Sequence, residues 1–342
     1  MHLTESKTPW SFFACRTPHA LLIWALGASL TSALSADWSV TKGKNEDLPG
    51  QNVTVANGGK IVARLIYGEG QQMPYLALYD EKGRRVTNAG IDRDGKEVGS
   101  EPHHRGIFLG WQKIQSSLGV ANLWSMREGT RMQLVSIEKM DATETAAAIV
   151  ARIEWRAGNK DASGSDLLIT ETRRMVISQP DSLRRTQVDL AIRLEAAREL
   201  TLDGNVQHAG VHFRAAHPVA KEPAKTSYLW SPDVPGANGT VVSDRLQWGE
   251  FVFPLEERWY RAAQFNAPAN PVQEFSKREY GRFGYFFKKT IARGEALSLV
   301  YRFLLESIPA PAQNPKRSAA ELAAARRDLD TVYAQFVAST AR

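Results

Sequence analysis

The segment at positions 186–195 reads TQVDLAIRLE, and its alternation of apolar and polar residues decides the fold class. Val, Leu, Ile and Leu occupy every second position, and polar or small residues lie between them. Because successive side chains of a strand point to opposite faces, this pattern predicts a strand that buries one face in an antiparallel sheet. The same alternation recurs at 149–156 and 297–305, so several such strands are expected.

Turn signals separate these strands between about residue 53 and residue 305, for example Asp-Gly at 203–204 and Asn-Gly at 238–239. About fifteen strands are expected, without the strand–helix–strand rhythm of a parallel sheet. The predicted fold class is therefore all-β, a large antiparallel β-sandwich with one C-terminal helix.

The C-terminal helix is predicted from its start signal and its apolar stripe. Ser318 and Glu321 have the spacing of a capping box, and apolar residues recur every three or four positions as far as Phe336. We expect this stripe to pack on the outside of the sandwich, and a helix that binds a partner or a second copy is the alternative. The predicted parts are a signal peptide at 1–35, a β-sandwich domain at 36–310 and the packed helix at 311–342.

The N-terminal segment has the order of a secretory signal. Lys7 and Arg16 precede an apolar stretch, ALLIWAL at 20–26, and small residues follow at 33–36. Cleavage is expected after Ser35 or Ala36, which would leave no membrane span and a periplasmic or secreted protein. An uncleaved membrane anchor is the alternative, because about 20 apolar residues can cross a bilayer.

Composition excludes several function classes. The 342 residues contain one Cys, so neither a disulfide scaffold nor a thiolate metal cluster is expected. The formal net charge of +6 is spread thinly, without a Lys/Arg run of the kind that binds nucleic acid. A mild positive charge is compatible with an anionic ligand.

Two adjacent histidines and an arginine stand in the segment EPHHRG at 101–106, just before the apolar run that ends at Trp111. His103, His104 and Arg105 offer a base, an acid and a fixed cation. In a regular strand the two His side chains would point to opposite faces, whereas in a loop both could reach one ligand. A solvated loop with one structural His is the alternative.

A second segment, HAGVHFR at 208–214, places His208, His212 and Arg214 on one face of a predicted strand. At roughly 3.3 Å per residue the two His lie about 13 Å apart, too far to share a metal ion. Such a face is either exposed to solvent or lines a polar groove, and we favour the groove.

A third segment contains Asn270, Arg278 and Tyr280, in a Pro- and Gly-rich loop that leads into the late strands. Arg278 and Tyr280 are evenly spaced and could meet at a ligand, and plain turn chemistry is the alternative. Trp111 and Trp124 are either core residues or platforms for the apolar face of a sugar ring.

The motifs together resemble a known family. Pro-His-His-Arg-Gly at 102–106, His-Ala-Gly-x-x-Phe-Arg at 208–214, Arg-x-Tyr-Gly at 278–281 and Gly-Glu-x-Leu-x-Leu-x-Tyr-Arg at 294–302 follow in this order. This order is similar to that of the secreted bacterial family called PmoA-like, or "methane oxygenase"-like. The resemblance implies a galactose-mutarotase-like supersandwich whose concave face binds carbohydrate. One departure is Phe275, where the family pattern has Trp.

The expected function is that of a carbohydrate-active protein, and we expect an enzyme. His104 and His208 would act as general acid and base, and Arg105 would assist them by stabilising negative charge. The expected partner is a carbohydrate, and an anionic one such as a uronate or a sulfated sugar is among the candidates. The residues expected to bind it are His103, Trp111, Trp124, His212, Arg214, Asn270, Arg278 and Tyr280. Epimerisation or mutarotation, elimination and hydrolysis are the candidate reactions, and hydrolysis is disfavoured because it normally uses two carboxylates.

Two alternatives remain open from the sequence. One is a non-catalytic glycan-binding envelope protein that uses the same groove. The other is a metal or oxygenase-type enzyme, with a divalent ion held by His103, His104 and His208. No cofactor is expected, because His208 and His212 lie too far apart to chelate one ion, and His103 and His104 diverge unless their loop is irregular. Activity is therefore expected to survive the removal of transition metals.

Overall fold

The computed structural model describes residues 37–182, 184–205, 207–232, 246–313 and 316–340. The predicted signal peptide at 1–35 lies outside the described residues. In the described part of the chain, no helix is both long and apolar enough to cross a membrane.

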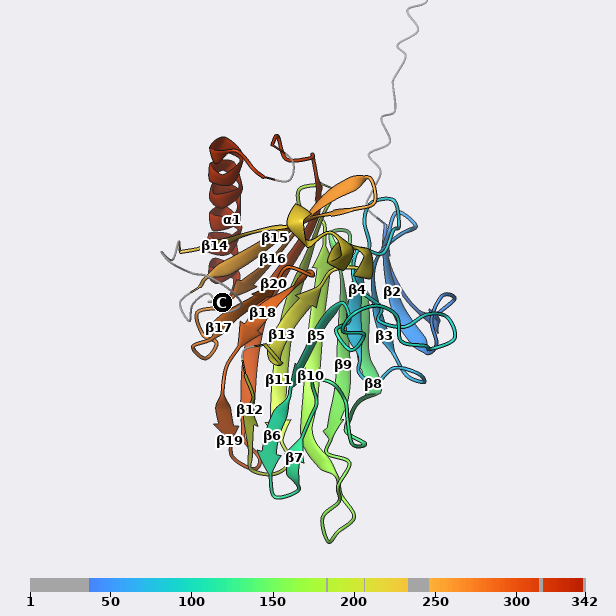
Figure 1. Ribbon diagram of the computed structural model, residues 1–342. Coiled ribbons are helices and arrows are strands. Elements are labelled where there is room, and N and C mark those ends of the chain that lie inside the picture. Colours follow the sequence, from blue (N-terminus) through green and yellow to red (C-terminus); the bar gives the residue numbers. More distant parts are fainter. Residues whose placement is uncertain (1–36, 183, 206, 233–245, 314–315, 341–342) are drawn as a thin grey trace, which may run out of the picture. The chain divides into compact units, whose positions relative to one another are not determined.

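The chain forms two eight-stranded sheets and one four-stranded sheet, and all strand pairings are antiparallel (Figure 1). The first sheet contains, in spatial order, β1 (Trp38–Lys44), β2 (Gln51–Asn57), β3 (Lys60–Tyr67), β4 (Tyr75–Leu78), β5 (Ile107–Trp111), β13 (Ala209–Arg214), β18 (Arg282–Phe286) and β17 (Glu274–Arg278). The second contains β14 (Ser227–Ser231), β15 (Trp248–Leu255), β16 (Arg258–Asn266), β20 (Ala296–Ile308), β11 (Arg185–Ala196), β10 (Leu167–Ser178), β9 (Ala146–Arg156) and β8 (Arg131–Ala142). The small sheet contains β19 (Lys289–Ile291), β12 (Leu200–Asp203), β6 (Lys113–Ser116) and β7 (Gly119–Ala121).

The all-β prediction is confirmed, and the segment at 186–195 lies inside β11 in the middle of the second sheet. The described residues form twenty strands where about fifteen were expected. Much of the difference is the small sheet, whose strands of three or four residues are too short to show a periodic pattern.

The two large sheets pack face to face around one apolar core. Val211 and Phe213 of β13 are fully buried in this core, together with residues of the second sheet such as Met175 and Val188. Because side chains alternate along a strand, His212 and Arg214 point to the opposite face of the first sheet. The polar residues His212 and Arg214 of the second sequence segment are therefore carried by a strand that the core holds in place.

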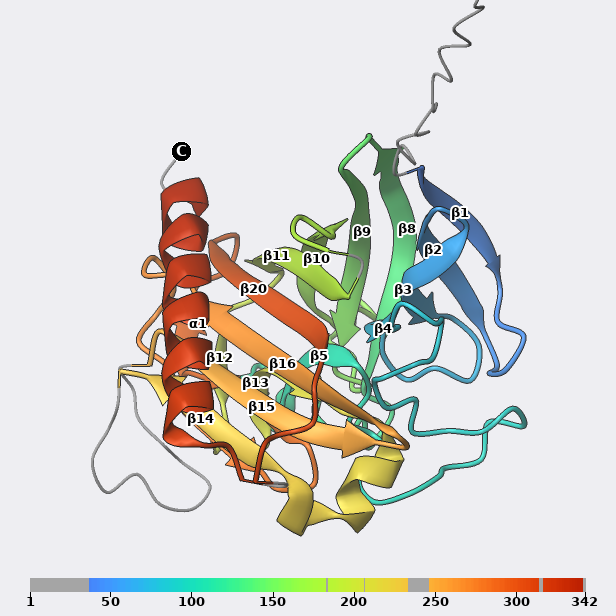
Figure 2. The same cartoon turned by 90° about the horizontal axis from the view of Figure 1, so that it is seen from above.

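Helix α1 (Ala319–Thr340) lies across the second sheet, over β20, β16, β15 and β14 (Figure 2). Leu329, Val332 and Phe336 are buried there, and they pack in one apolar cluster with residues such as Trp248 and Phe265. The predicted capping box forms, since the Ser318 backbone N–H donates to the Glu321 carboxylate at 2.7 Å and the Glu321 N–H donates to Ser318 Oγ at 3.2 Å. Two short 3₁₀ turns, His217–Lys221 and Pro223–Lys225, complete the described helices.

Candidate functional site

Three arginines form a row across adjacent strands of the first sheet. Arg214 of β13 pairs with Arg282 of β18, and Arg282 pairs with Arg278 of β17. Residues directly opposite each other in antiparallel strands share a face, with Cβ atoms about 4.5–5.5 Å apart. Like charges in such positions destabilise a sheet, so the arginine row lowers the free energy of unfolding. Its presence is therefore not explained by packing alone.

The central members of this arginine row are buried. Arg282 and Arg214 are both 0% exposed, and neither forms an ion pair with a carboxylate of the described residues. Arg282 donates to Tyr280 Oη at 3.1 Å and contacts His212 Nδ1 at 2.9 Å. Arg214 lies over the Tyr280 ring, 4.8 Å from its centroid. Burial lowers the pKa of Arg214 to about 10 and also lowers the pKa of Arg282.

Histidine and aromatic rings lie beside the arginine row. The ring centroids of His103 and His104 are 4.2 Å apart, and the His104 centroid lies 5.1 Å from that of Trp124 and 6.3 Å from that of Tyr280. Trp124 also approaches His208, at 6.3 Å between centroids. We call the full set the histidine–arginine cluster; it consists of Glu101, His103, His104, Trp124, His208, His212, Arg214, Arg278, Tyr280 and Arg282.

An irregular turn brings His103 and His104 to the same side. Glu101 has a positive φ of 53°, and the His104 backbone N–H donates to the Glu101 carbonyl at 3.0 Å. Gly106 also has a positive φ of 53°, and a Cβ there would lie 2.3 Å from the Leu76 carbonyl oxygen. The two His therefore stand in a turn and not in a regular strand, which is the case in which the sequence allowed both to reach one ligand.

Trp124 reaches the cluster because the residue of β5 beneath it, Gly110, has no side chain. A Cβ at Gly110 would lie 2.1 Å from the Leu123 carbonyl oxygen and 3.3 Å from Trp124 Cα. The backbone of 123–124 therefore crosses directly over β5. Trp124 is 1% exposed, and its indole N–H has no hydrogen-bond partner among the described residues.

Burial keeps the cluster histidines neutral. It lowers the pKa of His103 to about 4 and lowers the pKa of His104 well below the ordinary value of 6.5. Burial lowers the pKa of His208 as well, and Arg282 and Arg278 add to that effect. A histidine that is neutral at pH 7 can accept a proton or bind a metal, but it holds no extra proton to donate.

His208 is the best-positioned base in the cluster. It is half-buried, and its Nδ1 lies 2.9 Å from Asn205 Oδ1. Since an amide oxygen only accepts, the proton of the ring sits on Nδ1 and the lone pair is on Nε2.

His212 has a different place from the one predicted. It is fully buried, its Nε2 donates to the Ala209 carbonyl at 2.7 Å, and its Nδ1 accepts from Arg282 at 2.9 Å. Both ring nitrogens are used within the chain, so His212 positions Arg282 and does not itself face a ligand.

Three predicted site residues lie outside the cluster. The Arg105 guanidinium is turned away from it and donates to Gln71 Oε1 at 2.7 Å and to the Pro102 carbonyl at 3.2 Å. Trp111 is a core residue on the opposite face of β5, with its indole N–H donating to the Phe287 carbonyl at 3.1 Å. Asn270 holds its loop to β20, because its side chain exchanges hydrogen bonds of 2.7 and 2.8 Å with the Val300 backbone.

The sequence reasoning missed Arg282, the central member of the arginine row. Its signal was the continued even spacing of Arg278, Tyr280 and Arg282. Three carboxylates were candidates for hydrolysis. Glu101 is in the cluster, whereas Glu250 pairs with Arg317 at 2.7 Å and Glu279 pairs with Lys277 at 2.9 Å. The cluster thus lacks a second carboxylate among the described residues.

A family model matches residues 52–319, which include every residue of the cluster. The chain belongs to DUF6807, a family of unknown function. The resemblance to the PmoA-like family was therefore wrong, and its label has no bearing on this DUF6807 chain. The comparison with curated proteins gives no significant match.

The DUF6807 chain is similar to several solved structures at low identity. A galactose mutarotase-like protein from Clostridium acetobutylicum has 10% identity and a TM-score of 0.40, with 80% of this chain and 99% of that chain covered. Heparan sulfate lyase HepC from Pedobacter heparinus has 11% identity and a TM-score of 0.35, with 81% of this chain covered. A glycoside hydrolase family 97 variant from Pseudoalteromonas has 10% identity and a TM-score of 0.40, with 71% of this chain covered.

The DUF6807 chain spans 36% of the HepC chain and 34% of the glycoside hydrolase chain. The similar structures are thus carbohydrate-active enzymes and a mutarotase-like protein. Likeness at this level does not transfer an activity, so the reaction has to be argued from the cluster itself.

Proposed function

We propose that this protein binds an acidic sugar at the arginine row and removes a proton next to the sugar carboxylate, as an epimerase or a lyase would. The observation that carries the proposal is the pair of buried guanidinium groups, Arg214 and Arg282, without a carboxylate ion pair among the described residues. A buried charge left without an ionic partner costs about 3–5 kcal/mol, and the neutral acceptors around Arg214 and Arg282 offset only part of that cost. A ligand carboxylate or sulfate between the guanidinium groups would offset that cost.

Arginines at a carboxylate also favour the chemistry. When the hydrogen beside a carboxylate is removed, negative charge develops on the carboxylate oxygens. Fixed cations at those oxygens stabilise the transition state more than the ground state. Arg214 and Arg282 are held in place by hydrogen bonds and by the Tyr280 ring, so little reorganisation is needed when the charge develops.

We assign the base to His208. Its Nδ1 contact with Asn205 leaves Nε2 as the proton acceptor, and its ring is only half-buried. The low pKa of His104 makes it unsuited to donate a proton at neutral pH, so the role of general acid does not fit it. Tyr280, half-buried beside Arg214, is the ring that would contact the sugar.

The location remains part of the proposal. A periplasmic or secreted protein would meet acidic glycans outside the cytoplasm, and this expectation rests on the N-terminal residues 1–36. N-terminal sequencing of the protein purified from its native cell envelope tests it. A mature chain that begins near Ala36 is expected, and a chain that retains residues 20–26 would contradict the cleaved signal.

The ligand class is tested by calorimetric titration of the full chain with an oligouronate and with a neutral oligosaccharide of the same linkage. Charge-assisted hydrogen bonds contribute about 1.5–3 kcal/mol, so the acidic sugar should bind roughly 10–150 times more tightly. Arg282→Gln should abolish the difference, whereas Arg105→Gln, a matched buried arginine that is turned away, should retain it. Equal affinity for the two sugars would refute the proposal.

The reaction is tested with the same oligouronate. Elimination would be detected as ultraviolet absorbance from the new conjugated double bond, and epimerisation as incorporation of solvent deuterium at the carbon beside the carboxylate. Tight binding of all acidic sugars offered, without either signal, would favour the alternative of a non-catalytic glycan-binding protein.

A further inference from the structure

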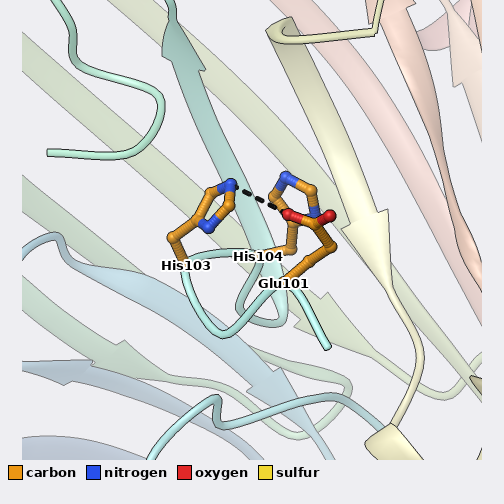
Figure 3. A group of neighbouring side chains, drawn as sticks. All are labelled: Glu101, His103 and His104. Carbon is orange, nitrogen blue, oxygen red and sulfur yellow. Dashed lines mark ion pairs between the residues drawn. The ribbon is translucent and has the colours of Figure 1, made fainter. Parts of the chain in front are cut away.

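Three side chains with metal-binding atoms meet at the turn of residues 101–104. The Glu101 carboxylate and the rings of His103 and His104 each offer one ligand atom, and these atoms all lie within 4.8 Å of one another. Figure 3 shows the three side chains pointing toward one another. His103 Nε2 and Glu101 Oε2 are 3.6 Å apart, which is too long for a hydrogen bond.

The His104 ring is an unsatisfied polar group inside the protein. His104 is 1% exposed, and neither Nδ1 nor Nε2 has a hydrogen-bond partner among the described residues. Leaving such a group unpaired costs about 1–3 kcal/mol. Its position is fixed by stacking on Phe108, at 5.5 Å between centroids, and by the edge of Trp124. A fixed imidazole with free nitrogens beside a carboxylate and a second imidazole is the arrangement that a metal ion requires.

We propose that Glu101, His103 and His104 bind a divalent first-row transition ion, with Zn²⁺ as the representative. Two imidazoles and one carboxylate are the protein ligands of many catalytic zinc sites, in which a further position stays open to water or substrate. Ca²⁺ and Mg²⁺ do not fit, because they need several oxygen ligands and this set supplies one carboxylate. The sequence-based expectation of no cofactor relied in part on a divergence of His103 and His104 that holds only in a regular segment, and these residues stand in an irregular turn.

The ligand set differs from the one considered from sequence, because it contains Glu101 in place of His208. Glu101 is half exposed, at 48% of its side chain, and its left-handed backbone turns the carboxylate toward the two rings. Non-Gly residues with positive φ are uncommon, and they are concentrated at functional sites. His208 remains available as the base.

The test is calorimetric titration of the full, chelator-treated protein with ZnCl₂ in the absence of any sugar. One ion per chain is expected. Loss of a group that only hydrogen-bonds to a metal ligand weakens metal binding about 10–100-fold, so loss of a direct ligand should weaken it by at least about 100-fold. This loss is expected for Glu101→Gln, His103→Asn and His104→Asn. Glu97→Gln and His217→Asn are the matched controls on neighbouring segments, and they should bind as the unmodified protein does.

Co²⁺ provides a second measurement. Its visible absorption is intense in a four- or five-coordinate site and weak in water, so a strong band at one equivalent is expected and should vanish in His103→Asn. His103 is partly exposed, at 18% of its side chain, so this variant is expected to fold even if His104→Asn does not. The proposal is overturned if Zn²⁺ binds His103→Asn as tightly as the unmodified protein, or if the unmodified protein binds no ion. Because no sugar is present, either result leaves the proposed function to its own tests.

Discussion

Repulsion within the arginine row can be measured by a double-mutant cycle on Arg214 and Arg282. Two unit charges roughly 6 Å apart repel by about 2–3 kcal/mol at an effective dielectric constant of about 20. Either single variant, Arg214→Gln or Arg282→Gln, relieves this repulsion, so the double variant cannot gain it a second time. We therefore expect the double variant to be destabilised by about 2–3 kcal/mol more than the sum of the two single effects.

Urea unfolding of the ligand-free protein at low ionic strength measures each free energy. A control cycle pairs Arg214→Gln with Arg105→Gln, whose guanidinium is turned toward Gln71, and this pair should be additive within about 0.5 kcal/mol. Arg282 donates to the Tyr280 hydroxyl and Arg214 lies over the Tyr280 ring, so the cycle is repeated in the Tyr280→Phe background, which removes the hydroxyl and keeps the ring. Additivity of Arg214 and Arg282 in both backgrounds, or a coupling of the opposite sign, would refute the argument that the row needs an anion.

Three further outcomes follow from the cluster. His208→Asn should lower kcat for an accepted sugar by about 10²–10⁴ with little change in KM. In the unmodified protein, the rate should fall on the acid side with a midpoint below pH 6.5, because burial and Arg282 lower the pKa of His208. A midpoint above pH 7 would exclude His208 as the base. Trp111→Ala should lower the free energy of unfolding, measured with urea, by about 3–5 kcal/mol, while the folded fraction keeps its sugar affinity. A loss of sugar affinity would show that Trp111 contacts the sugar. The pKa of His212 is lowered well below 6.5 in the folded state, so the unfolded chain binds the additional proton and the free energy of unfolding falls as the pH drops below about 6.5. His212→Gln should reduce the slope of that fall by up to about 1.4 kcal/mol per pH unit. An unchanged slope would contradict a neutral His212.

Strands such as β11 and β9 could be predicted because each has a buried and an open face, whereas β15 and β16 are buried along almost their whole length. In β11 and β9 the two faces correspond to alternating apolar and polar residues, so each strand can be predicted from its own residues alone. At His103 and His104 the alternation rule left two outcomes open, a regular strand or a loop, and the structure has a turn there. The left-handed conformation of Glu101 depends on the surrounding fold, so no local pattern announces it.

The arginine row could be predicted only in part. Arg214 and Arg278 were selected from their own segments, but the row exists because β13 pairs with β18 in one particular register. Register between strands about 70 positions apart is set by packing and turn geometry along the whole chain. The roles of Trp111 and Trp124 could not be predicted from the sequence for the same reason. One sits on the core face of β5, the other crosses over Gly110 of the same strand, and only the fold distinguishes them.

A cation at the proposed metal site would repel the arginine row unless a negatively charged ligand binds to both. A divalent ion adds two positive charges near Arg214 and Arg282, and the one carboxylate of the cluster, Glu101, is in the ion's own ligand set. A ligand carboxylate can serve both, with one oxygen on the ion and the other on a guanidinium, so ion and acidic sugar should each tighten the binding of the other by the same factor. A neutral sugar lacks the shared group and leaves the repulsion in place. The same carboxylate would then lose electron density to both cations, which is the condition for removing the proton beside it.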